Sequence, residues 1–112
     1  MTYELVCPTD EVQVDTPHRV VLQGNPIVVV RDSAGSVYAI GDTCTHGDIS
    51  LSEGFVENDT IECWAHGSMF SLRSGWPLNL PAYEPVPVFK VKIEDGDIYI
   101  DPTPIYEEQH TP

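Results

Sequence analysis

Short runs of β-forming residues alternate with turn signals along most of the chain. The run Ile27–Val30 is apolar at every position, which is typical of a strand that is buried on both faces. Near the C-terminus, Phe89, Val91 and Ile93 alternate with lysines, and this period of two predicts one dry and one wet face. Further β-rich runs lie at residues 3–6, 18–22, 37–40, 54–57, 60–62 and 98–100. Because no convincing amphipathic helix interrupts them, the pattern predicts an all-β fold with an antiparallel barrel or sandwich.

One internal segment, residues 42–83, differs from its surroundings. It holds two Cys/His pairs, both tryptophans and two prolines. We therefore predict a small ligand-bearing subdomain at 42–83 that is inserted into a β base formed by residues 1–41 and 84–101, so that a single domain covers 1–101. Residues 102–112 carry Pro, Glu and Thr with few apolar groups, and we expect them to form a loose tail.

Composition narrows the class of partner. The 112 residues suit one domain, and 18 acidic against 5 basic residues give a formal charge of −13. Such a charge repels nucleic acid and anionic membranes, and it suits a basic protein partner or simply keeps a small protein dissolved. No apolar run approaches the roughly 20 residues of a membrane helix, and the first residues have no basic region of a signal peptide. The odd count of three cysteines favours the cytoplasm, with thiols used as ligands.

The two Cys/His pairs carry the chemistry. One residue separates Cys44 from His46, two separate Cys63 from His66, and sixteen lie between the pairs. Two thiolates and two imidazoles fit either tetrahedral zinc or an iron–sulfur centre. Structural zinc sites usually pair Cys with Cys and His with His, whereas a Rieske centre uses two histidines in place of two cysteines on one of its irons. The mixed pairs therefore favour the Rieske centre, and a zinc-stabilised interaction module is the alternative.

The stretches 44–54 and 61–68 resemble the two boxes of Rieske ferredoxins from bacterial aromatic-ring-hydroxylating dioxygenases of the biphenyl and carbazole type. The similarity continues through residues 73–75 and 80–81. It implies the Rieske fold and one [2Fe–2S] cluster. The resemblance also implies how the four ligands divide. Cys44 and Cys63 would bind an inner iron, and His46 and His66 would bind an outer iron.

The same resemblance implies an electron carrier rather than an enzyme. The carrier would take one electron from a flavin-containing, NAD(P)H-dependent reductase and pass it to the Rieske centre of a terminal oxygenase, meeting both transiently as a monomer. The chain has no room for the 2-His-1-carboxylate iron domain of an oxygenase. Two alternatives remain, namely a Rieske ferredoxin that serves iron–sulfur cluster assembly and a small regulatory subunit of a reductase.

Several neighbours of the boxes are candidates for contact with the cluster. Trp64 is expected to cover it, and a loop that includes Pro81 is implied by the resemblance to pack over it. High-potential Rieske proteins donate two hydroxyl hydrogen bonds near the cluster, but this chain has only Ser68, with Phe70 in place of the tyrosine. Because such bonds stabilise the reduced cluster, we predict a potential in the low half of the range from about −150 to +300 mV. Cys7 lies far from both boxes and is expected to be a free, partly buried thiol.

Overall fold

The computed structural model describes residues 3–106 except His46, Asp48, His66 and Pro81. Its helices are short 3-10 turns, η1 (Thr9–Glu11) and η2 (Leu51–Glu53). The strands are β1 (Glu4–Pro8), β2 (His18–Leu22), β3 (Asn25–Arg31), β4 (Val37–Gly41), β5 (Phe55–Glu57), β6 (Thr60–Glu62), β7 (Met69–Ser71), β8 (Val88–Phe89), β9 (Val91–Glu94) and β10 (Asp97–Ile100). No helix in this part of the chain is long and apolar enough to cross a membrane.

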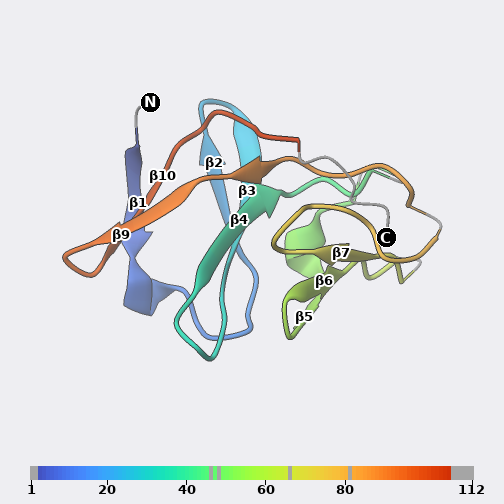
Figure 1. Ribbon diagram of the computed structural model, residues 1–112, viewed down its shortest axis with the longest axis horizontal. Coiled ribbons are helices and arrows are strands. Elements are labelled where there is room, and N and C mark those ends of the chain that lie inside the picture. Colours follow the sequence, from blue (N-terminus) through green and yellow to red (C-terminus); the bar gives the residue numbers. More distant parts are fainter. Residues whose placement is uncertain (1–2, 46, 48, 66, 81, 107–112) are drawn as a thin grey trace.

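The strands form three sheets, and neighbouring strands within each sheet run antiparallel. The sheet orders are β1-β10-β9, β2-β3-β4-β8 and β5-β6-β7. Figure 1 shows the β2-β3-β4 strands in the middle, with β1 and β9 toward one end of the long axis and β5–β7 toward the other. This arrangement confirms the predicted all-β fold and its antiparallel pairing.

The central strand β3 separates two hydrophobic cores. The apolar residues Ile27–Val30 are all fully buried, as the sequence predicted for a strand with no wet face. Because side chains alternate along a strand, Val28 and Val30 enter one core while Ile27 and Val29 enter the other. The middle sheet is therefore buried on both faces, and it is the layer that connects the β base to the segment that holds the Cys/His pairs.

We name the two cores by their contents. The buried members of the cysteine core are Val28, Val30, Ile40, Cys44, Leu51, Ile61, Cys63, Phe70, Leu72, Ala82, Val86 and Val88. The buried members of the base core are Cys7, Val12, Ile27, Val29, Ala39, Phe89, Ile98 and Ile100.

The predicted turns and strands have the expected conformations in most places. Asp95 and Gly96 both adopt positive φ, 53° and 79°, which is the backbone of the hairpin turn that the Asp-Gly signal indicates. The alternating run at residues 89–93 is not a single strand, because Phe89 ends β8 in the middle sheet whereas Val91 begins β9 in another sheet. The expected dry face fails at Ile93, which is exposed, while Phe89 is buried. Strand β7, which is three residues long, was not predicted.

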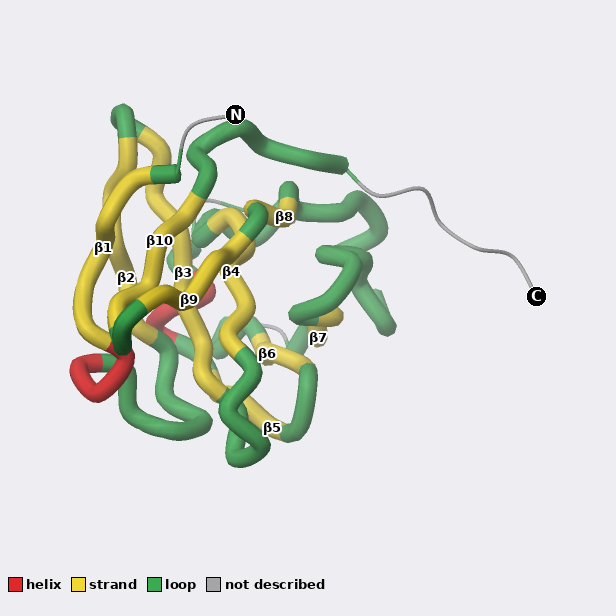
Figure 2. Tube along the Cα trace, turned by 60° about the vertical axis from the view of Figure 1, so that its left-hand side comes forward, coloured by secondary structure: helices red, strands yellow, loops and turns green. Residues whose placement is uncertain are grey.

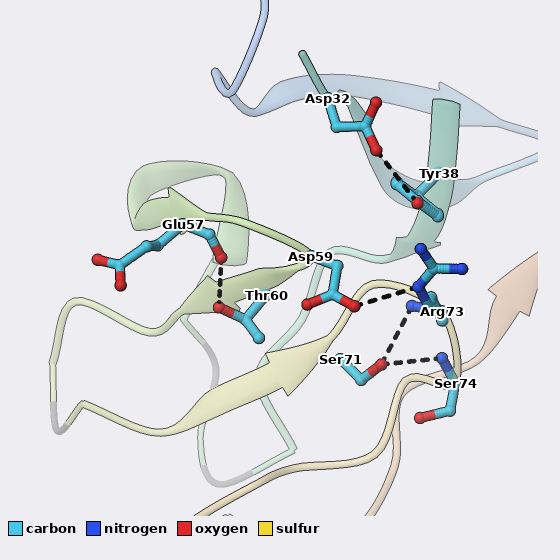
Figure 3. Close-up of polar contacts among 8 residues, drawn as sticks. All are labelled: Asp32, Tyr38, Glu57, Asp59, Thr60, Ser71, Arg73 and Ser74. Carbon is cyan, nitrogen blue, oxygen red and sulfur yellow. Dashed lines mark hydrogen bonds and ion pairs between the residues drawn. The ribbon is translucent and has the colours of Figure 1, made fainter. Parts of the chain in front are cut away.

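A polar network connects the β5–β7 sheet to the middle sheet (Figure 3). Arg73, which follows β7, donates from Nε to Asp59 Oδ2 at 3.1 Å, and its guanidinium lies 5.6 Å from the centre of the Tyr38 ring on β4. The Tyr38 hydroxyl in turn donates to Asp32 Oδ2 at 3.3 Å. The network is solvent-exposed, so it orients the two sheets and contributes little to stability.

The segment that we predicted to be a loose tail begins with an attached part. Ile105 exchanges two backbone hydrogen bonds with Val88, at 2.7 and 2.9 Å, and its side chain packs against the cysteine core. The bonds hold the chain near β8 as far as residue 105. Residues 107–112 lie outside the described part of the chain, and the division into base, inserted subdomain and tail stays a prediction.

Candidate metal centre

The first Cys/His pair lies on a loop that is closed at its base by a β-bridge between Thr43 and Ser50. The Cys44 N–H donates to the Ile49 carbonyl at 2.9 Å, and the Gly47 N–H donates back to the Cys44 carbonyl at 3.1 Å. These bonds close the loop between Cys44 and Ile49. The cysteine therefore begins the loop with its backbone fixed.

The second pair lies on a loop with the same form of closure. Residues Glu62 and Met69 are paired at its base, where β6 meets β7. The Cys63 N–H donates to the Ser68 carbonyl at 2.8 Å, and the Gly67 N–H donates to the Cys63 carbonyl at 3.0 Å. Gly67 has a φ of 76°, a conformation that glycine adopts at no steric cost. In both loops, then, the backbone N–H of the cysteine donates to the carbonyl of the residue five positions later.

The two loop cysteines meet in one core. Cys44 is 1% exposed and Cys63 is 0% exposed, neither forms a disulfide, and both belong to the cysteine core. Ile49 and Ala65 are partly buried and pack against the same core. A thiolate in apolar surroundings is costly unless a cation lies beside it. Two buried thiols on facing loops therefore fit the inner ligands of a metal or of an iron–sulfur cluster.

The other predicted ligands, His46 and His66, lie outside the described residues, as do Pro81 and Asp48. Among residues that the structure describes, no group of three or more His, Cys, Asp or Glu side chains comes together as a metal site. The described chain thus brings together two of the four predicted ligands, and the predicted tetrad still depends on the two histidines that the sequence places within the same loops.

The long connection between β7 and β8, residues 72–87, is fastened to the second loop (Figure 2). The Asn79 side chain accepts from the Met69 N–H at 2.7 Å and donates to the Gly67 carbonyl at 3.0 Å, so one amide spans the end of the loop. The Ala82 N–H donates to Ser68 Oγ at 3.0 Å. We did not predict the role of Asn79, because its partners are backbone groups that leave no mark in the sequence.

The same connection is also fastened to the first loop. The Thr45 hydroxyl donates to the Glu84 carbonyl at 2.7 Å, and the Gly41 N–H donates to the Pro87 carbonyl at 2.8 Å. Residues 72–87 therefore hold both loops at a fixed distance from one another. Each of these hydrogen bonds limits the conformational freedom of the loops, which a metal would otherwise have to restrict when it binds.

Of the three residues that the sequence predicts to contact the cluster, Ser68 and Trp64 lie within the described part of the chain. Ser68 is fully buried, and its hydroxyl, while accepting from Ala82, keeps one proton that it can donate. Trp64 is more than half exposed, so a large part of its ring faces solvent. The contact of either residue with a cluster stays a prediction.

The third cysteine is set apart from the loops. Cys7 belongs to the base core, on the other face of β3 from Cys44 and Cys63. Burial raises the pKa of its thiol, and the nearby Glu11 and Asp97 carboxylates raise that pKa further. The raised pKa keeps this thiol protonated, and Cys7 lies apart from the two loop cysteines.

Comparisons with known proteins bear on this arrangement. Residues 2–90 match the family model described as the Rieske [2Fe-2S] domain. The 3-phenylpropionate/cinnamic acid dioxygenase ferredoxin subunit of Escherichia coli (strain K12) is 40% identical over 96 residues, which are 85% of this chain and 89% of the relative.

Solved structures agree with the sequence comparison. The ferredoxin of carbazole 1,9a-dioxygenase from Nocardioides aromaticivorans IC177 matches with a TM-score of 0.87 and 31% identity, over 92% of this chain and 100% of that chain. A chain in the complex of reduced oxygenase and oxidized ferredoxin in carbazole 1,9a-dioxygenase matches with a TM-score of 0.81 and 35% identity, over 96% of this chain and 97% of that chain.

Proposed function

This chain belongs to the Rieske [2Fe-2S] domain family, and we propose that it is the ferredoxin component of an aromatic-ring-hydroxylating dioxygenase system, which supplies electrons to a terminal oxygenase. The resemblance seen in the sequence is thereby confirmed. The observation that carries the proposal is the pair of buried cysteines, neither of them in a disulfide, at matching positions of two loops that close in the same way.

Four residues would hold the cluster, namely Cys44 and Cys63 on one iron and His46 and His66 on the other. When bound, a Rieske cluster supplies the storage and release of a single electron, at a potential raised by neutral imidazole ligands. The chain contributes the surroundings. The cysteine core keeps water from the thiolate side, and the bonds of Asn79 and Thr45 keep the loops from moving between redox states.

An apolar surface beside the second loop supports docking at this end of the molecule. We call it the loop patch; its exposed members are Trp64, Leu78, Leu80 and Tyr83. All four belong to the second loop or to the β7–β8 connection. Of these, Leu78, Leu80 and Tyr83 line one hollow of the surface. Exposed apolar side chains that gather in this way are typical of a contact surface, and a small one suits a carrier that must dissociate after each transfer.

The partners follow from this role. The oxygenase receives the electron, a flavin-containing reductase supplies it from NAD(P)H, and both contacts are transient while the carrier itself is a monomer. The reducing cytoplasm suits three cysteines that form no disulfide, two of which must remain available as ligands. The charge of −13 suits docking surfaces that are basic.

The test is spectroscopy of the isolated protein with metal analysis. We expect two irons and two labile sulfides per chain, and, after reduction with dithionite, a rhombic EPR signal with a lower average g than that of all-cysteine clusters. The matched variants are Cys44→Ser, which should abolish the signal, and Cys7→Ser, which should preserve it. One zinc ion and no labile sulfide in the native protein would contradict the proposal.

A further inference from the structure

The first ligand loop stands on a shorter base than the second. Beneath the second loop, β6 and β7 are paired at three successive positions. Beneath the first loop there is a single isolated bridge, between Thr43 and Ser50. With less regular strand pairing below it, the first loop needs another means of holding Cys44 in place.

Asp42 supplies that means, because all its polar groups are hydrogen-bonded and two of them, its carbonyl and Oδ1, bond across the base of the loop. Its N–H donates to the Pro26 carbonyl at 3.1 Å, and its carbonyl accepts from the Leu51 N–H at 2.5 Å. Its Oδ1 accepts from the Ser52 N–H at 2.7 Å. One residue thus joins the chain that enters the loop to the chain that leaves it, and joins both to the start of β3.

The carboxylate of Asp42 has one counter-charge in the described structure. Its Oδ2 accepts a hydrogen bond at 3.0 Å from Nε of Arg19, which lies on β2. The Asp42 side chain is 1% exposed, whereas that of Arg19 is 49% exposed. A carboxylate so deeply buried is unfavourable without a cation beside it. The positive charge of Arg19 therefore offsets the free-energy cost of burying the Asp42 carboxylate, while the Arg19 side chain itself stays about half exposed to solvent.

We propose that Asp42 is a positioning residue for Cys44 and that Arg19 neutralises it, so that the first ligand loop is fixed without an unpaired negative charge beside the redox centre. The inference rests on the proposed function, since it concerns a residue two positions from a proposed cluster ligand. It assigns to the pair two separable effects, one on the position of the loop and one on the reduction potential.

The sign of the second effect distinguishes the two partners. Reduction adds one negative charge to the centre, so an unpaired carboxylate nearby opposes reduction and an unpaired guanidinium favours it. Arg19→Gln leaves the carboxylate without its partner and should lower the potential. Asp42→Asn keeps an oxygen that can accept from Ser52 but leaves Arg19 unpaired, and it should raise the potential. A role in folding alone would not depend on the sign of the charge removed.

The experiment is a redox titration of the cluster-loaded variants, followed by EPR. We expect opposite shifts in the two single variants, each of the order of tenfold in the one-electron equilibrium constant, or about 59 mV. The double variant and Arg19→Lys, which keeps the positive charge, should both stay near the parent value. Shifts in the same direction, or no shift, would overturn the electrostatic role. If Asp42→Asn yields no folded protein, the sign of the Arg19→Gln shift alone decides.

The chain contains a matched control pair. Arg73 and Asp59 form the same kind of contact at 3.1 Å, but their side chains are 68% and 48% exposed. Arg73→Gln and Asp59→Asn remove the same charges from a pair that water screens. Their effect on the potential should be clearly smaller than that of the Arg19 and Asp42 variants, and an equal effect would count against the proposal.

The positioning role has its own readout. Asp42→Ala removes the acceptor of the Ser52 N–H, and we expect broader EPR lines and several-fold faster loss of iron to a chelator than in the parent. Unchanged lines and an unchanged rate of iron loss would overturn this role. A parent protein that lacks the Rieske signal would instead refute the proposed function, so the two failures are distinguishable.

Discussion

At the scale of single residues, the site depends on polar atoms that serve two neighbours at once. Ser68 is the clearest case, because its carbonyl closes the second loop on Cys63 and its hydroxyl receives the Ala82 N–H. Asn79 does the same with a single amide that bonds on both sides of Ser68. Such residues transmit the position of the β7–β8 connection to the ligand loop.

Replacing Ser68 by alanine should therefore affect both stability and redox behaviour. The Ala82 N–H would be left buried without its acceptor, which costs about 1–3 kcal/mol in the free energy of unfolding. If the hydroxyl also donates toward the cluster, the potential falls as well. Denaturant unfolding and a redox titration measure the two effects. Ser74→Ala, at a partly exposed turn, is the control, and equal losses of stability in both variants would contradict the prediction.

Asp101 gives the protein a pH dependence at its C-terminal side. Its carboxylate accepts from the Thr103 N–H at 3.0 Å, and this hydrogen bond holds the pKa of Asp101 below its usual value. Because the folded pKa is the lower one, the stabilisation is present above the unfolded value, about 3.9, and is lost as the pH falls through the folded pKa. Asp101→Asn should flatten the fall of unfolding free energy below about pH 4. Parallel stability curves for the parent and the variant would refute this.

At the scale of elements, β3 is the strand on which the molecule is organised. Its alternate side chains enter two separate cores, one of which contains both loop cysteines. The strand therefore couples the β base to the ligand loops through packing, in addition to the polar bonds around them.

Adjacent residues of β3 allow this division to be tested. Val28→Ala and Val29→Ala each remove two fully buried methyl groups, and each should lower the free energy of unfolding by about 2 kcal/mol. Only Val28→Ala opens the cysteine core, so only that variant should broaden the EPR lines and speed the loss of iron. Equal cluster stability in the two variants would show that the cores are not independent.

At the scale of the whole molecule, net charge and exposed apolar surface act over different distances. The −13 charge attracts basic partners over a distance, whereas the loop patch acts only on contact. Long-range attraction sets how often the partners meet, and the patch sets where they meet. The two effects therefore respond to different changes.

Electron transfer to the oxygenase should become slower as ionic strength rises, because salt screens the attraction. Leu80→Ser should slow transfer at every salt concentration without changing the potential, since Leu80 is 75% exposed within the loop patch. Leu5→Ser is the control, because Leu5 is 60% exposed on β1 in the base. Stopped-flow measurement of oxygenase reduction compares them, and similar rates for the two variants would exclude the patch from docking.

Sequence alone determined the class of fold and predicted the donor set. Alternating and fully apolar runs predicted most strands, because the period of side chains along a strand is a local property, whereas β7 was not predicted. The mixed Cys/His spacing indicated a Rieske centre because the ligand types and their separations are written directly in the chain. The burial and closure of Cys44 and Cys63 agree with that hypothesis.

Only the tertiary structure revealed what holds the loops. Arg19 and Asp42 are 23 residues apart, and Thr45 and Glu84 are 39 apart, so neither contact has a periodic signal. The attachment of Ile105 to Val88 likewise has no signal in the local sequence. Local patterns specify strands and ligands, whereas the partners of a side-chain carboxylate or amide are fixed only when distant segments pack together.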